Sequence, residues 1–230
     1  MVQEKIQTDS VLSAAAELRY LLGRGYPRPG ALTFVGNHHQ LGKTAREVLA
    51  RGVFDQAAAN SRRERLIPAS NVAGRPLAID GHNVIITLES AVEGLPLVEA
   101  DDGLIRDIAG RHGSYQPGPI TEKVFPKLFE ALARLRPSRV LFLLDAPLSR
   151  SGDLALLVSA GLDESGIEHE ARAVPVPEDE LIPFSGPVAT SDSVLIDSVA
   201  EPFDLAGFII RGLNPAPALI RLWLKPETVA

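Results

Sequence analysis

Residues 77–83 read LAIDGHN, and this stretch decides the class of fold. Three apolar residues lead to Asp80, a glycine and His82 follow, and a helix-like run begins at Val84. A short apolar run of this kind is typical of a buried strand in a parallel sheet. Because open α/β sheets bind their ligands at the carboxyl ends of the strands, we expect Asp80 to lie at a ligand site.

Two later runs repeat the pattern of an apolar strand that ends in an aspartate. They are LFLLD, which ends at Asp145, and PVATSD, which ends at Asp192. Like charges gathered at one edge of a sheet raise one another's pKa unless a cation compensates them, and hard oxygen ligands favour Mg²⁺ or Mn²⁺. The sequence therefore predicts that Asp80, Asp145 and Asp192 are catalytic acids and the ligands of a divalent cation.

Polar neighbours of these acids extend the predicted site. Asn83 falls on the first turn of the helix that follows Asp80, where its amide could position a phosphate or a water. Ser191 precedes Asp192 and is expected either to cap the next helix or to bond a ligand. Asn83 and Ser191 are therefore the first predicted substrate-binding residues.

A fourth acid would complete such a site, and PEDEL (residues 177–181) offers Asp179, with Glu178 as the alternative. The competing interpretation is that these carboxylates only favour the start of a short helix through its dipole. Arg106 and Arg150 are expected to contact phosphate, unless they are ordinary solvated arginines. Asp102 is either a further acid of the pocket or a turn residue.

From residue 77 onward, strand-like and helix-like segments alternate along the chain. The expected strands are residues 77–80, 96–100, 139–145, 167–174, 187–190 and 205–210. The expected helices are residues 84–92, 122–135, 153–165, 178–182 and 193–200. This alternation predicts an α/β domain over residues 77–230, with a doubly wound, mostly parallel sheet and helices on both faces. The strand at 96–100 could instead belong to an edge hairpin.

The first 66 residues have the pattern of a small all-helical domain. Apolar residues recur at helical spacing, with Ser10 as the expected cap of the first helix. The expected helices are residues 11–22, 29–35, 44–50 and 54–66. Residues 67–76, IPASNVAGRP, have the composition of a linker between this domain and the α/β domain.

Charge is distributed unevenly along the 230 residues. Residues 1–66 hold ten Lys or Arg and six Asp or Glu, whereas residues 67–230 hold thirteen and twenty-three. A basic segment beside an acidic pocket would suit a protein that binds nucleic-acid phosphates with the basic segment. A small net positive charge is, however, also common in small helical domains. The chain has no cysteine and no apolar run of the ~18 residues that span a bilayer, so we expect a cytoplasmic protein without a membrane partner.

The segment GNHHQLGKT, residues 36–44, resembles a phosphate-binding loop but departs from its spacing. Five residues separate Gly36 from Gly42, where a P-loop has four. His38 and His39 are adjacent, so we expect their side chains to diverge and to make a poor metal pair. A nucleotide-binding phosphotransferase is therefore the least favoured function, and a polar loop or a nucleic-acid contact is favoured for this segment.

The motifs IDGHNVI, LLDAP and ATSD, in this order, resemble the PIN-like superfamily of metal-dependent nucleases, closest to its NYN branch. The resemblance covers roughly residues 75–210. It implies that Asp80 is the first metal ligand, Asn83 its polar neighbour, Asp145 the second acid and Asp192 the late acid. His82 stands where NYN proteins often have tyrosine, and the intermediate acid is not fixed, with Glu178, Asp179 or Asp153 in question.

The whole chain also resembles a prokaryotic family called domain of unknown function 434. The stretches that carry this likeness are LRYLLGRGYPRPGALTFVG and ITLESAVEGLPLVEADDGLIRDIAGRHGSY. That resemblance spans nearly all 230 residues and implies no activity. Together the two resemblances place a PIN-like domain after the helical segment.

The leading hypothesis is a Mg²⁺- or Mn²⁺-dependent ribonuclease whose basic helical segment grips RNA, such as tRNA or another structured RNA. The alternative is a non-catalytic PIN-like protein that binds RNA or serves as an interaction module. Metal-dependent RNA cleavage separates the two. The sequence leaves homo-oligomer formation open.

Overall fold

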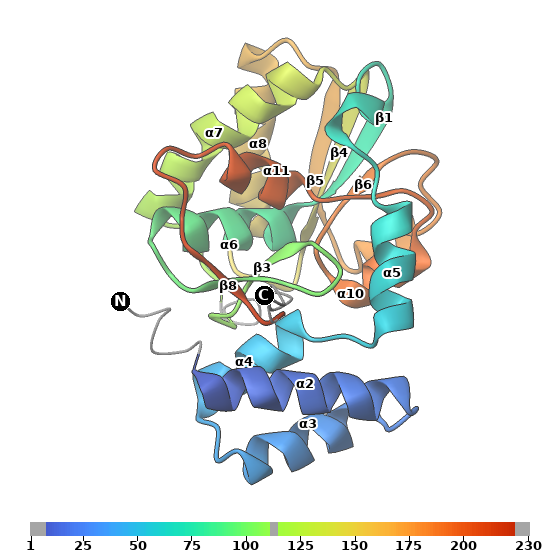
Figure 1. The fold of residues 1–230 in the computed structure, drawn as a ribbon. Coiled ribbons are helices and arrows are strands. Elements are labelled where there is room, and N and C mark those ends of the chain that lie inside the picture. Colours follow the sequence, from blue (N-terminus) through green and yellow to red (C-terminus); the bar gives the residue numbers. More distant parts are fainter. Residues whose placement is uncertain (1–7, 111–114, 224–230) are drawn as a thin grey trace. The chain divides into compact units, whose positions relative to one another are not determined.

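The computed structural model describes residues 8–110 and 115–223 (Figure 1). Within them the chain forms two compact units. Unit 1 contains residues 8–64, 96–110 and 218–223, and unit 2 contains residues 65–95 and 115–217. None of the helices in these residues combines the length and the apolar character that crossing a membrane requires.

Unit 2 is built on a five-stranded sheet whose paired strands all run parallel. The strands are β1 (Pro76–Asp80), β4 (Arg139–Asp145), β5 (His169–Val174), β6 (Val188–Ala189) and β7 (Pro202–Phe203). Their order across the sheet is β5-β4-β1-β6-β7. The central strands β1 and β4 are almost continuously apolar because both of their faces are covered, which explains the runs LAI and VLFLL.

Helices cover both faces of this sheet (Figure 1). One layer consists of α6 (Gly81–Val92), α7 (Pro119–Leu135), α8 (Ser151–Glu164) and α11 (Leu205–Arg211), which pack against one another and onto β4 and β5. On the other face, α9 (Glu178–Leu181) and α10 (Ser193–Ser198) contribute Leu181 and Leu195 to a core with Leu141 and Leu143 of β4. The predicted parallel α/β architecture with helices on both faces is confirmed.

The order of the strands places a topological switch at β1. The chain proceeds from β1 to β4 and β5 on one side, then returns to the other side of β1 for β6 and β7. The connection after β1 therefore leads to one side of that strand, and the connection after β6 leads to the other side. In open α/β sheets a ligand crevice lies at such a point, outside the carboxyl ends of the strands.

One predicted strand of unit 2 is wrong. Residues 205–210 form helix α11 instead of a strand. Asp204 caps this helix, because its Oδ1 accepts a hydrogen bond of 2.8 Å from the backbone N–H of Gly207. A six-residue apolar run fits a buried helix as well as a buried strand, and here the capping aspartate decides between them.

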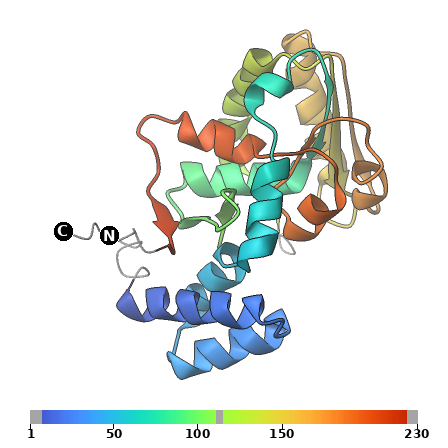
Figure 2. The same ribbon diagram turned by 45° about the vertical axis from the view of Figure 1, so that its right-hand side comes forward.

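Unit 1 combines helices with a small sheet of its own. Its helices are α2 (Asp9–Gly23), α3 (Arg28–His38), α4 (Lys43–Gly52) and most of α5 (Gln56–Arg65). Its strands are β2 (Leu97–Glu99), β3 (Ile105–Asp107) and β8 (Leu219–Arg221), in the order β3-β2-β8. The strand β2 pairs antiparallel with β3 and parallel with β8. Helices α2 and α3 lie side by side in both views (Figure 2).

The core of unit 1 joins segments that are far apart in the sequence. Leu18 of α2 and Leu49 of α4 are fully buried in one cluster with Val98 of β2 and Ile220 of β8. Arg19 of α2 binds the carboxylate of Asp101 through two hydrogen bonds of 2.7 Å and the carbonyl of Leu222 at 3.0 Å. The position of α2 therefore depends on two residues that lie much later in the sequence, Asp101 and Leu222.

This arrangement corrects the predicted division into contiguous domains. The segment 9–65 is mainly helical as expected. The predicted α/β domain, residues 77–230, includes the residues of β2, β3 and β8, which instead complete unit 1. The predicted strand at 96–100 is indeed part of a hairpin, which lies in this separate sheet. The first helix is capped by Thr8, not by Ser10, through a bond of 3.4 Å to the Val11 N–H.

Candidate functional site

Asp80 lies at the carboxyl end of β1, at the switch point, and its side chain is buried. The hydroxyl of Thr190, just after β6, donates a hydrogen bond of 2.8 Å to Asp80 Oδ2. Burial raises the pKa of Asp80 to about 7, and the charges of Asp145 and Asp192 add to the rise against the hydrogen bonds from Thr190 and the Asn83 backbone. Asp145 and Asp192 therefore lie near enough to Asp80 to act on its carboxylate.

The turn after Asp80 is packed tightly against β4. A Cβ atom on Gly81 would lie 2.4 Å from the Phe142 ring and 2.7 Å from the Leu143 carbonyl oxygen. Only glycine is therefore accommodated at this position without a shift. The sequence Asp-Gly in LAIDGHN thus reflects the close approach of the first helical turn to the neighbouring strand.

Asp145 ends β4 and pairs with His82 from the first turn of α6. His82 Nδ1 lies 2.9 Å from Asp145 Oδ2 and 2.9 Å from the Asp145 backbone nitrogen. A protonated Nδ1 donates to the carboxylate, and an unprotonated Nδ1 accepts from the backbone N–H. The imidazole is fully buried and meets the ring of Tyr115 edge to face, with 5.3 Å between centroids. Tyr115 in turn donates a hydrogen bond of 2.9 Å to the buried carboxylate of Glu89.

Asn83 and Ser191 are brought together as partners of one another. The backbone N–H and the hydroxyl of Ser191 donate hydrogen bonds of 2.8 and 2.9 Å to Asn83 Oδ1. The contact fastens the start of α6 to the segment after β6. Asp192 comes next and is exposed, with Oδ1 accepting bonds of 2.9 Å from the N–H groups of Val194 and Leu195 at the start of α10.

The three aspartates form a cluster of charges without a compact coordination shell. Within the described residues, one group of three or more metal-ligating side chains has its ligand atoms within 4.8 Å of one another, and it lies elsewhere, in unit 1. One oxygen of Asp192 is already used to cap α10, and one oxygen of Asp145 faces His82. The structure thus places a buried carboxylate, that of Asp80, at the switch point. For all three aspartates to bind one cation directly, their side chains would have to move or water would have to bridge them.

The predicted fourth acid, Asp179, belongs to the short helix α9. Asp179 is exposed on α9, and the carboxylates that raise the pKa of Asp80 are Asp145 and Asp192. The neighbouring Glu180 forms an ion pair with Arg172, whose hydrogen bonds hold the pKa of that carboxyl below its usual value. Asp179 therefore stays a prediction.

Asp204 is an acid at the same edge of the sheet that sequence reasoning missed. It follows β7 directly, is buried, and lies 3.1 Å from Arg211 while it caps α11. The signal was present in PFDLAG, a short apolar strand that ends in aspartate. The prediction of a strand over residues 205–210 conceals this pattern, because it leaves Asp204 at the start of a strand and not at the end of one.

Arg106 is not a substrate-binding residue at this edge, because it belongs to the interior of unit 1. It is buried and forms two hydrogen bonds of 2.8 Å with Asp102, which also binds Arg62 at 3.1 Å. Burial alone would raise the pKa of Asp102, but the bonds and charges of the two arginines outweigh it and hold the pKa below its usual value. Asp102 is accordingly a partner in a buried ion pair and not an acid of the pocket.

Arg150 is exposed between β4 and α8, where its Nε lies 3.0 Å from the exposed carboxylate of Asp153. Its backbone has a φ of 62°, which is uncommon for a residue with a side chain. An exposed arginine that follows β4 at the predicted edge stays a candidate for phosphate contact. Asp153, the alternative fourth acid, is engaged with it.

The segment GNHHQLGKT lacks the structural context of a P-loop. Helix α3 contains its first three residues and α4 begins at Lys43, so a helix stands where a P-loop requires a strand. The phosphotransferase hypothesis loses its basis here. The expectation that His38 and His39 diverge is also wrong, because their ring centroids lie 4.9 Å apart, edge to face.

Comparison with known proteins divides the chain close to the start of unit 2. Residues 10–65 match the protein family of unknown function DUF434, and residues 69–208 match the domain of unknown function DUF5616. The chain belongs to the DUF5616 family. An uncharacterized protein from Methanocaldococcus jannaschii is 33% identical to this DUF5616 chain over 189 residues, which cover 82% of the chain and 90% of that protein. No solved structure matches it.

The expected resemblance to domain of unknown function 434 is thereby confirmed in a narrower range. It holds for residues 10–65, the helical part of unit 1, and does not extend over nearly the whole chain. The residues at the switch point all lie inside the DUF5616 match.

Proposed function

We propose that unit 2 is a PIN-like domain that hydrolyses RNA phosphodiester bonds with Mg²⁺ or Mn²⁺ held by Asp80, Asp145 and Asp192. The observation that carries this proposal is the position of Asp80. A buried carboxylate stands at the topological switch of a parallel sheet, within the influence of two further carboxylates. This is the edge at which α/β sheets place ligands.

The donor set suits the proposed cation. Carboxylate oxygens are the ligands that Mg²⁺ and Mn²⁺ prefer, and the described part of the site presents them without a cysteine or a free imidazole in competition. Burial and mutual repulsion disfavour the ionised form of Asp80, and a nearby positive charge would reverse both effects. When bound, a divalent cation would supply the charge that stabilises a phosphodiester transition state.

The remaining residues of the site have positioning roles in this proposal. The Thr190 hydroxyl fixes the orientation of the Asp80 carboxylate, and His82 fixes the end of β4 that carries Asp145. Asn83 and Ser191 hold the segment that carries Asp192 against the start of α6. Arg150 is the exposed cation that we propose for contact with an RNA phosphate.

A non-catalytic PIN-like module that binds RNA or a partner protein is the second candidate. A specific observation favours it: the Asp145 carboxylate faces His82, and Asp192 caps a helix. If these engagements persist in solution, the edge would keep its shape without forming a complete metal shell. RNA cleavage separates the two candidates.

The test is an RNA cleavage assay with the full chain, in Mg²⁺, in Mn²⁺ and in excess chelator, on a panel that includes tRNA and unstructured RNA. We expect metal-dependent cleavage that falls by at least about 100-fold in Asp80→Asn, a loss of roughly 3 kcal/mol of transition-state stabilisation. Asp163→Asn, an exposed carboxylate near the end of α8, is the matched control and should retain activity. RNA binding without cleavage that survives Asp80→Asn would favour the non-catalytic candidate. Absence of RNA binding would contradict the nuclease and the RNA-binding form of the second candidate.

A further inference from the structure

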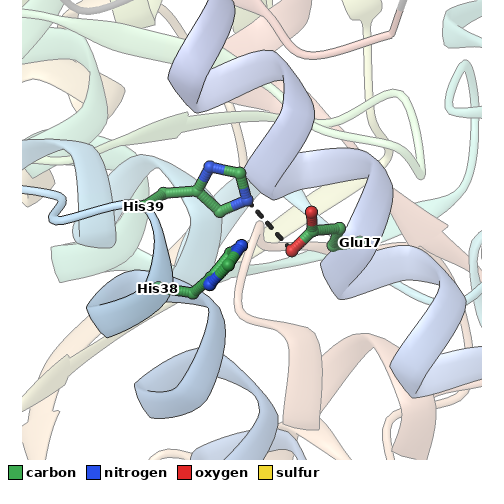
Figure 3. Close-up of side chains that lie close together, drawn as sticks. All are labelled: Glu17, His38 and His39. Carbon is green, nitrogen blue, oxygen red and sulfur yellow. Dashed lines mark ion pairs between the residues drawn. The ribbon is translucent and has the colours of Figure 1, made fainter.

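A separate group of potential metal ligands lies in unit 1 (Figure 3). Glu17 projects from α2, His38 ends α3, and His39 follows it as the C-terminal cap. One ligand atom from each of the three side chains lies within 4.8 Å of the other two. The packing of α2 against α3 therefore brings together two imidazoles and one carboxylate that are separated by twenty residues of sequence.

The two adjacent histidines converge because the helix ends between them. His38 keeps helical geometry, whereas His39 has a φ of −86° and a ψ of 5°. The backbone N–H of His39 still bonds to the Val35 carbonyl, so its position is fixed by the helix. The ring of His38 lies nearly parallel to that of Phe34 and perpendicular to that of His39.

The contact between His39 and Glu17 leaves a buried nitrogen without a hydrogen bond. Glu17 Oε2 lies 2.9 Å from His39 Nε2, which is an ion-pair distance. The approach is not aligned for a hydrogen bond, and Nε2 has no hydrogen-bond partner within the described residues. A buried imidazole nitrogen that faces a carboxylate and a second imidazole has the chemistry of a metal ligand.

The ligand types select a class of cation. Imidazole nitrogen suits Zn²⁺ far better than Mg²⁺, and two histidines with one glutamate form an established kind of zinc site that keeps a position for water. Tetrahedral Zn²⁺ with bonds of about 2.0–2.1 Å places its ligand atoms about 3.4 Å apart. The exposed side chains of His38 and Glu17 can close the present spacing by small rotations, since neither is confined by the core. The chain has no cysteine that would compete for the ion.

We propose that Glu17, His38 and His39 form a Zn²⁺-binding site in unit 1. The site is independent of the proposed nuclease function, since it uses none of the residues at the switch point. Bound Zn²⁺ would cross-link α2 to the end of α3. It would thereby stabilise the helical part of unit 1.

The first experiment measures Zn²⁺ affinity by competition with a chromophoric chelator. The full chain carries Asp80→Asn in every sample, so that the acidic edge does not contribute its own cation site. We expect one Zn²⁺ per chain and a loss of affinity of about tenfold or more in Glu17→Gln and in His38→Ala. Glu64→Gln, an exposed glutamate on α5, is the matched control and should leave the affinity unchanged. Equal affinity in all variants, or no binding, would overturn the proposal.

The second experiment identifies the ligands and does not depend on stability. Co²⁺ in place of Zn²⁺ should give visible d–d absorption of a four-coordinate site, absent in His38→Ala. Because a metal binds neutral imidazole, acid should abolish the signal and metal binding should release protons. A spectrum of octahedral, fully hydrated Co²⁺ would show that Glu17 and His39 form only an ion pair. A negative result for Zn²⁺ binding would not change the outcome of the RNA cleavage assay, so the two proposals are tested separately.

Discussion

Asp80 is the residue on which the chemistry of unit 2 depends, and its position has a cost. The carboxylate is buried at the end of β1, and the carboxylates of Asp145 and Asp192 act on it. Its hydrogen bond from Thr190 offsets this only in part. The folded chain therefore holds a group that prefers to be protonated near neutral pH.

This preference predicts how the stability of the chain depends on pH. The pKa of Asp80 is about 7 in the folded chain and near its ordinary value of 3.8 when unfolded, so the folded state binds more protons between these values. The contribution of Asp80 is therefore most favourable below pH ~4 and is lost as the pH rises through about 7. The difference corresponds to an upper limit of roughly 4 kcal/mol.

Urea unfolding at a series of pH values measures this dependence. Asp80→Asn should be more stable than the wild type at pH 8 and should lose much of the slope between pH 4 and 7, while Asp163→Asn should follow the wild type. Mg²⁺ or Mn²⁺ should stabilise the wild type at pH 8 and have little effect on Asp80→Asn. Parallel curves for wild type and Asp80→Asn would contradict the environment described for this carboxylate.

At this scale the sequence predicts the acids better than their partners. Asp80, Asp145 and Asp192 could be located because each closes an apolar run that is visible in one dimension. The pairing of Asp145 with His82 depends on how α6 lies against β4, and the burial of Arg106 depends on which sheet its strand joins. Neither is encoded in local spacing, and for this reason the sequence wrongly predicts a phosphate contact for Arg106.

Among the elements, the connection between β1 and α6 is the most constrained. Gly81 begins α6 directly after the strand, and the space for its side chain is filled by the Phe142 ring and a backbone carbonyl of β4. The carbonyl belongs to a strand in the middle of the sheet and cannot move without disturbing its pairing with β1. A side chain at position 81 would therefore displace the turn and, with it, Asp80.

Gly81→Ala should destabilise the chain by about 1–3 kcal/mol, because the added methyl overpacks a rigid site. It should also displace Asp80 and reduce any RNA cleavage. Gly152→Ala is the control, since no atom lies within 4 Å of its added Cβ in α8, and it should be neutral or stabilise by up to about 1 kcal/mol. Chemical denaturation of both variants gives the comparison, and equal stabilities would show that β4 yields at Gly81.

The elements also show where pattern recognition stops. The strand predicted over residues 139–145 has the observed bounds of β4, since a run of five consecutive buried positions on an interior strand leaves little ambiguity. LAGFII at 205–210 is as apolar but forms α11, because Asp204 supplies a cap and the helix packs on α6 and α7. Short apolar runs take their conformation from their tertiary surroundings.

On the scale of the whole molecule, unit 1 is assembled from three separate segments of the chain. Ile220 of β8 is fully buried among residues of α2, α3 and α4. Ile220→Ala should therefore cost about 2–5 kcal/mol and increase amide hydrogen exchange in residues 9–52, more than 160 positions away in sequence. Ile182→Ala, at a largely exposed position of unit 2, is the control and should change neither. Unchanged exchange in α2–α4 would mean that these helices are stable without β8.

The contact of Arg19 with both Asp101 and Leu222 has a consequence for the order in which the protein matures on the ribosome. The helices of unit 1 emerge before unit 2, yet their partner strand β8 is translated only after the whole sheet of unit 2. Unit 2 can close once β7 and α11 have emerged, because its strands and helices are then complete. The helices α2–α4 are therefore expected to keep apolar surface exposed to chaperones until β8 is translated, and to become native after unit 2.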